Sequence, residues 1–206
     1  MKHLDSLTPA VIKVGQGRGF IVRYRPPFRG EPVFDDQPLV ITAAHCLPRI
    51  PRHLFDERPF KNLLGPLDTR TPKVWAECLF VDPVGDLAVL GPPDSQRFGE
   101  ESESYLALTD DLTALQIGGV AEGSLWLLGL DGKWYSSGAK KLHHTYWLEG
   151  PTVGGMSGSP ILSDRGHAIA LVSTGSDTDS EAMSSHQPSL FDRLPGWLAR
   201  QAKRSR

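Results

Sequence analysis

The sequence has few cysteines, no long apolar run and almost no excess of charge. Its two cysteines, Cys46 and Cys78, lack the paired spacing of a zinc site, and we interpret them as reduced, buried thiols rather than as a disulfide. No apolar stretch approaches the roughly 20 residues with which a helix spans a bilayer, so we expect no membrane as a partner. The net charge of -2 does not favour a protein dedicated to binding nucleic acid.

The sequence also lacks the signals of secretion and of cofactor binding. Asp5 and Lys13 interrupt the N-terminal stretch, so we expect no secretory signal and a cytoplasmic protein. His143 and His144 are interpreted as a half-exposed pair on opposite faces of a strand, not as metal ligands. We therefore expect neither a metal ion nor a cofactor.

Glycine and proline, in contrast, are abundant, with 21 and 17 residues. Such a turn-rich composition favours a largely β chain over a helical bundle. About a dozen short strands with turn signals between them predict a β-barrel or a β-sandwich. The glycine pattern at 15–19 is similar to part of a dinucleotide-binding loop, but a β-branched strand follows it instead of a helix, so it predicts a hairpin.

Two segments are expected to differ from this pattern. Residues 92–111 are acidic and polar and predict a solvated loop, in which 100–103 is also a candidate docking surface. Residues 194–202 predict a helix, with Trp197 and Leu198 on its docking face. The basic tail at 200–206 is interpreted as the solvated end of that helix.

Three short patterns contain the residue types of nucleophilic catalysis. They are ITAAHC at 41–46, VGDLAVL at 84–90 and GGMSGSP at 154–160. A serine hydroxyl needs a base such as imidazole within hydrogen-bond reach, and the imidazole needs a carboxylate on its other nitrogen. A developing oxyanion needs N–H donors, and glycines beside the serine let the backbone turn so that its amides supply them.

In the order His, Asp, Ser, these patterns resemble those of the trypsin/chymotrypsin-like serine peptidases, and of their bacterial intracellular members in particular. TAAHC matches the family's histidine motif, GDLAVL its aspartate strand and GMSGSP its Gly-x-Ser-Gly-Gly/Ser-Pro motif. The resemblance covers nearly the whole chain. It implies an all-β unit of two six-stranded β-barrels, at about 8–92 and 112–192, with the site in the cleft between them and a C-terminal helix at about 193–203.

The resemblance implies a role for each matching catalytic residue. Ser157 is the nucleophile, His45 is the general base and Asp86 orients His45. The N–H groups of Gly155 and Ser157 form the oxyanion hole. Asp82 is a rival to Asp86, but it precedes a proline as turn residues do, whereas Asp86 opens the apolar strand.

Five residues match the positions that bind substrate in the family: Pro151, Thr152, Ser173, Thr174 and Gly175. The last three correspond to the strand that pairs with the substrate backbone, and the first two to the primary specificity pocket. Pro151 replaces the acidic residue that makes trypsin select Lys or Arg. Thr152 resembles the residue at this position in glutamate-specific bacterial members of the family. The histidine in the pocket of those members, however, has no counterpart at Val172. We therefore favour a small or medium uncharged side chain in the pocket.

Two departures from the family bear on activation and on disulfides. Met156 precedes the nucleophile, where digestive members of the family have an Asp that receives a newly cut N-terminus. No Ile-Val-Gly-Gly start is present either, so we expect no such activation switch. Cys46 matches a disulfide position of the family, but no cysteine lies in the preceding strand.

We interpret the chain as a serine endopeptidase that hydrolyses peptide bonds through an acyl-enzyme and is not specific for Lys or Arg. Its partners would be a protein or peptide substrate and a dedicated regulatory or target protein, as in an effector protease of stress or antiviral defence. Two alternatives stay open. One is a catalytically latent, protease-like binding module, and the other is an esterase with the same Ser-His-Asp chemistry.

Overall fold

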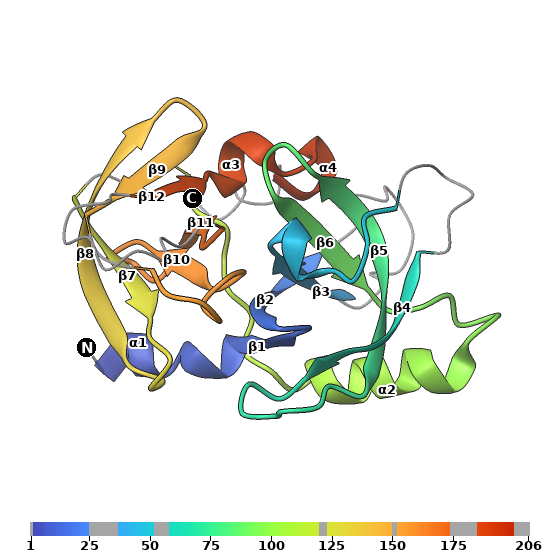
Figure 1. Cartoon of the computed structure of the whole chain (residues 1–206). Helices are drawn as coiled ribbons and strands as arrows, with labels where there is room; N and C mark the ends of the chain where they lie inside the picture. The colour runs from blue at the N-terminus through green and yellow to red at the C-terminus, as the bar shows by residue number, and fades with distance from the viewer. Residues whose placement is uncertain are drawn as a thin grey trace, which may run out of the picture.

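The computed structural model describes residues 2–24, 37–51, 58–119, 123–149, 152–173 and 185–199. Within these segments, twelve β-strands form two antiparallel sheets, with short helices at their edges (Figure 1). No helix in the described segments is both long enough and apolar enough to cross a membrane.

The first six strands close into a barrel in the order β1-β2-β3-β6-β5-β4. They are β1 (Val11–Val14), β2 (Gly17–Tyr24), β3 (Gln37–Thr42), β4 (Pro59–Gly65), β5 (Val74–Asp82) and β6 (Leu87–Gly91). β-Branched and aromatic side chains such as Phe20 and Ile41 fill its interior and are fully buried. β1 and β2 pair as the hairpin that the glycine pattern at 15–19 predicts.

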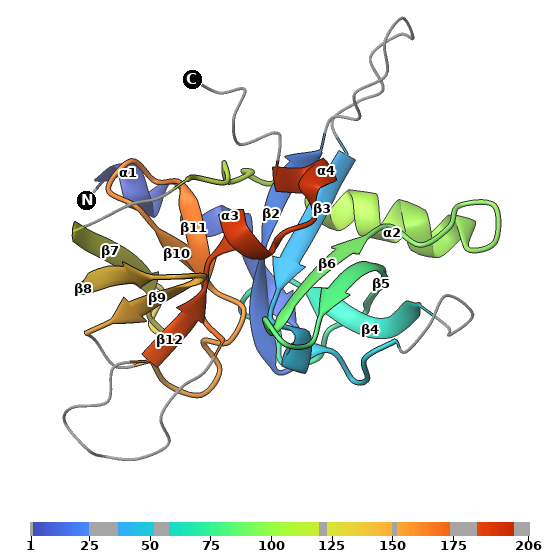
Figure 2. The same ribbon diagram turned by 90° about the horizontal axis from the view of Figure 1, so that it is seen from above.

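The other six strands form a sheet in the order β11-β10-β7-β8-β9-β12. They are β7 (Gly123–Leu128), β8 (Trp134–Leu142), β9 (Thr145–Leu148), β10 (Pro160–Leu162), β11 (Ala168–Leu171) and β12 (Ser185–Pro188). A bridge between Ala170 and Ser189 joins its two ends, so the sheet is nearly closed. The prediction of two six-stranded β-barrels is confirmed, and Figure 2 shows them side by side.

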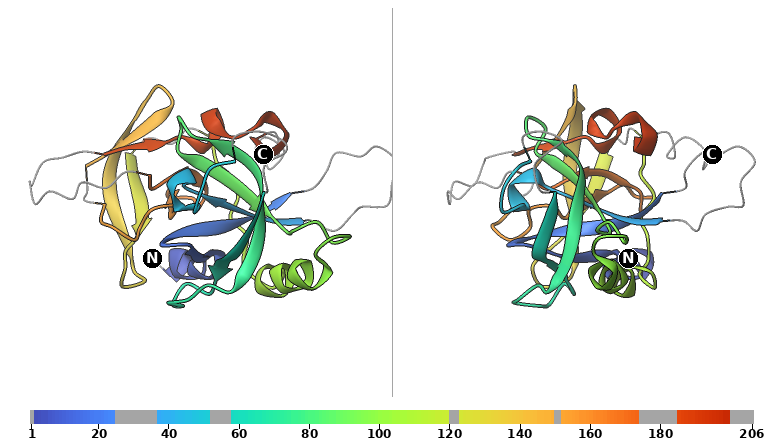
Figure 3. Two further views of the ribbon diagram at one scale, coloured as in Figure 1. Left: turned by 45° about the vertical axis from the view of Figure 1, so that its right-hand side comes forward. Right: turned by 90° about the vertical axis from the view of Figure 1, so that its right-hand side faces the viewer.

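The prediction of a solvated loop at 92–111 is wrong, because this segment contains the helix α2 (Gly99–Thr109). It packs against β5 on the outside of the first barrel (Figure 3). Its buried face consists of Ser102, Tyr105 and Thr109, and the Tyr105 hydroxyl donates to the carbonyl oxygens of Pro38 and Leu90. These three residues are spaced by three and four positions, as residues on one face of a helix are. Because their side chains are polar, the sequence shows no hydrophobic periodicity that would predict the helix.

The predicted C-terminal helix is two short helices, α3 (Leu190–Arg193) and α4 (Gly196–Ala199), and residues 200–203 lie outside the described segments. The break falls at Leu194, whose backbone is extended because a proline follows it. The predicted docking face is confirmed: Leu198 is buried, and the Trp197 ring contacts Tyr24 edge to face at 5.0 Å.

Helix α3 lies between the two barrels (Figure 2) and is tied to both. Asp192 pairs with Lys141 of β8 at 2.7 Å, and its neighbour Arg193 pairs with Asp82 at the end of β5 at 3.5 Å. The remaining short helices are α1 (Lys2–Asp5), η1 (Thr8–Ala10) and η2 (Ala44–Cys46). Of these, η2 carries His45 into the site.

Candidate active site

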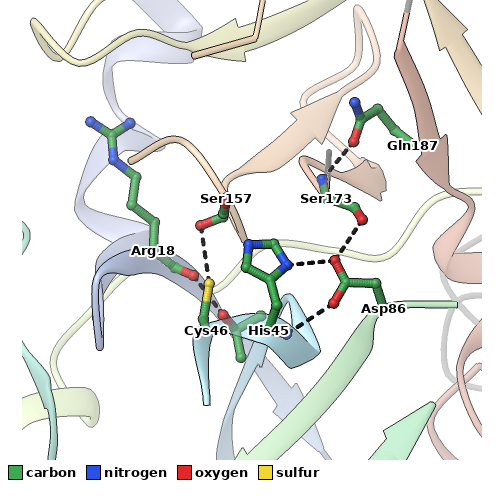
Figure 4. A network of polar contacts seen from close by, with 8 residues as sticks. Arg18, His45, Cys46, Asp86, Ser157, Ser173 and Gln187 are labelled. Atoms are coloured by element: carbon green, nitrogen blue, oxygen red, sulfur yellow. Dashed lines mark hydrogen bonds and ion pairs between the residues drawn. The ribbon is translucent and has the colours of Figure 1, made fainter. Parts of the chain in front are cut away.

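The pairing of β3 with β6 brings His45 and Asp86 together. Thr42 is opposite Ala88 in this pair of strands. His45 follows Thr42 by three residues, in η2, and Asp86 precedes Ala88 by two, so both lie beyond the same end of the pair. Ser157 comes from the second barrel, in the loop between β9 and β10. Figure 4 shows the His45 ring between Asp86 on one side and Ser157 on the other.

Asp86 binds His45 through both of its carboxylate oxygens. Oδ2 lies 2.7 Å from His45 Nδ1, and Oδ1 accepts the His45 backbone N–H at 2.9 Å. A carboxylate beside Nδ1 favours the tautomer with its proton on that nitrogen. The lone pair of Nε2 is then free to take a proton on the side of the ring where Ser157 lies.

Ser173 contacts this pair, although the sequence assigns it only to substrate binding. Its hydroxyl donates to Asp86 Oδ2 at 2.5 Å, and its backbone N–H donates to Oε1 of Gln187 at 2.5 Å. Gln187 is completely buried in β12. Sequence reasoning missed Gln187, because the segment SHQP has no strand-forming pattern that would draw attention to it.

The turn before Asp86 is built by Asp82, as predicted. Asp82 Oδ1 accepts the N–H groups of Val84 at 3.1 Å and of Gly85 at 2.9 Å, which is a typical use of an Asp side chain in a turn. Asp86 follows with φ of 51°, in the left-handed region that few residues other than glycine adopt. The turn thus sets the direction from which Asp86 reaches His45.

Two consecutive turns place the Ser157 loop. The N–H of Met156 donates to Val153 at 3.1 Å, and the N–H of Ser159 donates to Met156 at 2.9 Å. The third residue of each turn is a glycine with positive φ, 88° at Gly155 and 81° at Gly158. Turns of type II require positive φ at this position, which explains the glycines around the serine.

Among the described residues, the N–H groups predicted to form the oxyanion hole have no partner. Within the described segments, neither Gly155 nor Ser157 donates its backbone N–H to a protein acceptor. The carbonyl oxygen of Ser157, in contrast, is held by the N–H of Arg18 at 2.7 Å. The loop is therefore anchored on its carbonyl side and leaves these two donors available to an incoming oxyanion.

In the part of the chain that the structure describes, the Ser157 hydroxyl makes no hydrogen bond with His45. Catalytic hydrogen bonds are often long without substrate and tighten in the complex. The backbone of the loop is nevertheless close to His45, because the thiol of Cys46, the next residue, lies 3.7 Å from the Ser157 carbonyl oxygen.

Both cysteines are buried and free, as predicted. Burial raises the pKa of both thiols, that of Cys78 to about 11. Gly17, at the start of β2, lies beside Cys46, and a Cβ at Gly17 would overlap the Cys46 sulfur. The space that a side chain at position 17 would need is thus occupied by the Cys46 sulfur.

Of the five predicted substrate-binding residues, Pro151, Thr174 and Gly175 lie outside the described segments. Thr152 and Ser173 are buried. Met156, in the position of the family's acidic residue, packs in the hydrophobic core of the second barrel.

The expectation for the paired histidines is wrong in one respect. His143 and His144 form the turn between β8 and β9, where His143 has φ of 52°, rather than part of a strand. Both are exposed, and the described segments contain no cluster of three or more His, Cys, Asp or Glu side chains suited to a metal ion.

Comparison with known proteins relates the chain to others through its fold. No family model matches it, and no curated protein matches it. A human pathogenic astrovirus serine protease is 16% identical, with a TM-score of 0.52 over 91% of this chain and 94% of that one. The Rv3671c protease in an inactive form is 16% identical, with a TM-score of 0.54 over 96% and 91%. The MamO protease domain from Magnetospirillum magneticum is 13% identical, with a TM-score of 0.52 over 92% and 95%.

These similarities define the class of fold. The chain has the two-barrel fold of the trypsin/chymotrypsin-like serine proteases, as its three motifs predict. At such low identity the similarity concerns the fold alone, and the roles of His45, Asp86 and Ser157 remain predictions.

Proposed function

We propose that the protein is a serine endopeptidase that hydrolyses peptide bonds through an acyl-enzyme. One observation carries the proposal: His45, held by Asp86 at 2.7 Å, lies beside the Ser157 loop, whose two oxyanion-hole N–H groups have no partner in the described segments. A base, its orienting carboxylate and oxyanion donors are the parts that serine acyl transfer needs.

The first half of the reaction forms an ester. Nε2 of His45 takes the proton of the Ser157 hydroxyl while Oγ bonds to the carbonyl carbon of the substrate. The N–H groups of Gly155 and Ser157 bind the resulting oxyanion, and Asp86 stabilises the imidazolium. The C–N bond then breaks, and His45 returns the proton to the leaving amine.

The second half releases the acid. His45 takes a proton from water, and the hydroxide bonds to the ester carbon and forms a second oxyanion in the same site. The C–O bond to Ser157 breaks, and the proton on His45 returns to Oγ. Throughout, Ser173 donates to Asp86 and keeps its carboxylate oriented towards His45.

The proposal extends to specificity and biological setting. With Pro151 and Thr152 at the positions of the specificity pocket, we expect cleavage after a small or medium uncharged residue and not after Lys or Arg. We further propose a bacterial, cytoplasmic effector protease with a dedicated regulatory or target protein. A peptide library with each residue type before the cut tests the specificity, and abundant cleavage after Lys or Arg would contradict it.

Labelling with a fluorophosphonate probe tests the nucleophile. We expect native wild-type protein to be labelled, and heat-denatured protein and Ser157→Ala to remain unlabelled. Ser136→Ala is the matched control, because it removes an exposed hydroxyl on β8 and should leave labelling unchanged. Labelling of Ser157→Ala at the wild-type rate would refute the assignment.

A second candidate, the latent protease-like binding module, is favoured by one observation. The Ser157 hydroxyl makes no hydrogen bond to His45 in the described segments. Absence of labelling in folded wild-type protein would support this candidate. An esterase would be labelled and would cleave activated esters, but it would leave every peptide of the library intact.

A further inference from the structure

A buried arginine lies beneath the Ser157 loop. Arg18 is at the start of β2 in the first barrel and is 5% exposed. Its Nη1 crosses to the second barrel and donates to the carbonyl oxygens of Leu128 at 2.9 Å and Gly129 at 3.1 Å, with Ser159 Oγ at 3.5 Å. Among the described residues it has no carboxylate partner.

The backbone of Arg18 holds the same loop. Its N–H donates to the carbonyl oxygen of Ser157 at 2.7 Å, and its carbonyl oxygen accepts the Thr42 hydroxyl at 2.7 Å. A Cβ on Gly158 would overlap that same carbonyl oxygen. The residue after the nucleophile is therefore packed directly on the Arg18 backbone.

The turn that receives the guanidinium also contacts the oxyanion loop. Leu130 follows Gly129 in the connection between β7 and β8. Its side chain lies 3.5 Å from the point where a Cβ on Gly155 would be. Arg18 thus contacts the loop directly at Ser157 and Ser159 and supports it indirectly through Leu130.

A buried cation held by uncharged acceptors is unusual. Taking a charge out of water is costly unless hydrogen bonds replace its hydration, and burial lowers the pKa of Arg18. Its acceptors are backbone carbonyls of a neighbouring turn and one hydroxyl, so the interaction orders backbone rather than neutralising an acid.

We propose that Arg18 is a positioning residue that holds the Ser157 loop in the form with its Gly155 and Ser157 N–H groups open. The inference rests on the proposed function and adds its regulation. Met156 is buried and apolar and cannot form an ion pair, so the residue before the nucleophile provides no charged anchor. Arg18 anchors the loop from the first barrel, and the site is competent without cleavage of the chain.

The test compares three variants of the full chain. Arg18→Met keeps most of the apolar stem and removes the guanidinium. Arg18→Lys keeps a cation but loses the planar fork that reaches several acceptors at once. Arg23→Met is the matched control, because it removes a guanidinium from the same strand, where Arg23 pairs with Asp110.

The rate of fluorophosphonate labelling per folded molecule is measured together with Tm and the proton NMR signal of His45 Nδ1–H. We expect labelling to fall about 100-fold in Arg18→Met, as for a lost oxyanion donor, and only about 10-fold in Arg18→Lys, which keeps a cation. The His45 signal should persist, because Asp86 and His45 belong to the first barrel. Arg23→Met should be labelled at the wild-type rate.

A lower Tm with unchanged labelling in both Arg18 variants would overturn the inference, because Arg18 would then only join the barrels. If Arg18→Met does not fold, Arg18→Lys decides by the same criterion. Folded wild-type protein that is not labelled at all would instead refute the proposed function, and the inference with it.

Discussion

Asp86 accepts three hydrogen bonds in the site. Two come from His45, through Nδ1 and the backbone N–H, and one comes from the Ser173 hydroxyl. Three donors fix the plane of the carboxylate, and a fixed carboxylate keeps the imidazole in the tautomer that serves as a base. The orientation of His45 therefore depends on a residue of the second barrel.

Removing the Ser173 hydroxyl should slow the reaction while leaving the protein folded. A hydrogen bond to a charged group contributes about 1.5 kcal/mol, so we expect Ser173→Ala to lower kcat/KM roughly 10-fold. Steady-state hydrolysis of the best library peptide measures this, with Ser136→Ala as the control. A rate equal to that of wild type would show that the two bonds from His45 suffice.

Gly158 has two reasons to be glycine. Its φ is 81°, and any Cβ would overlap the Arg18 carbonyl oxygen. We expect Gly158→Ala to reduce fluorophosphonate labelling by at least about 100-fold, because the loop must move away from its oxyanion-hole geometry. Gly154→Ala is the control, since a Cβ there meets no atom within 4 Å. Equal labelling of the two variants would contradict the loop geometry.

At the scale of elements, α3 connects the barrels through neighbouring side chains. Asp192 binds Lys141 on one side, and Arg193 binds Asp82 on the other. Asp82 in turn builds the turn before Asp86. A short helix near the C-terminus is therefore linked to the carboxylate that orients His45.

The Asp192 pair predicts a dependence of stability on pH. Burial alone raises the pKa of Asp192, but the hydrogen bond and charge of Lys141, together with Ser189 and His144, outweigh burial and leave the pKa lowered. A carboxyl with a lowered folded-state pKa stabilises the fold above its unfolded pKa of about 3.9. This stabilisation is lost as the pH falls through the lowered pKa.

We therefore expect Asp192→Asn to have a lower Tm than wild type at neutral pH, and the difference to shrink as the pH falls below about 4. Thermal unfolding followed by circular dichroism across this range measures it. Asp68→Asn, on an exposed turn, should follow the wild-type curve. A Tm difference that stays constant with pH would exclude the ion pair as its cause.

The elements also differ in how far the sequence predicts them. The strand that precedes His45 and the strand that follows Asp86 combine β-branched residues with motifs of fixed order, and both signals are local. Helix α2 was missed because its buried side chains are Ser102, Tyr105 and Thr109, whose burial depends on acceptors in other strands.

The sequence also does not predict the contacts between segments that lie far apart along the chain. Arg18 lies 110 positions before its acceptor Leu128, and Ser173 lies 87 positions after Asp86. Neither pair has a local pattern, because the two partners meet only when the two barrels dock. Motifs predict which residues react, whereas the residues that hold them in place emerge from the fold.

At the scale of the whole molecule, the site is shared by two barrels that one of the two hydrophobic clusters joins. The same hydrophobic cluster contains Phe20 and Leu90 of the first barrel and Leu128 and Leu162 of the second. His45 and Asp86 come from one barrel and Ser157 from the other. The site therefore depends on the docking of the barrels.

We expect unfolding in urea to be a single cooperative transition, because neither barrel can expose its part of the shared cluster alone without a large loss of burial. Tryptophan fluorescence and fluorophosphonate labelling should be lost at the same urea concentration. Two separate transitions would show that the barrels unfold independently.

The glycine beside Cys46 has a consequence for the chemistry that the molecule tolerates. Because the Cys46 sulfur fills the space at Gly17, no covalent link fastens His45 to the neighbouring strand. Packing alone sets the shape of the site at this point. A reducing solution therefore has no bond to break at this point, and the site keeps the same geometry at a low electrochemical potential.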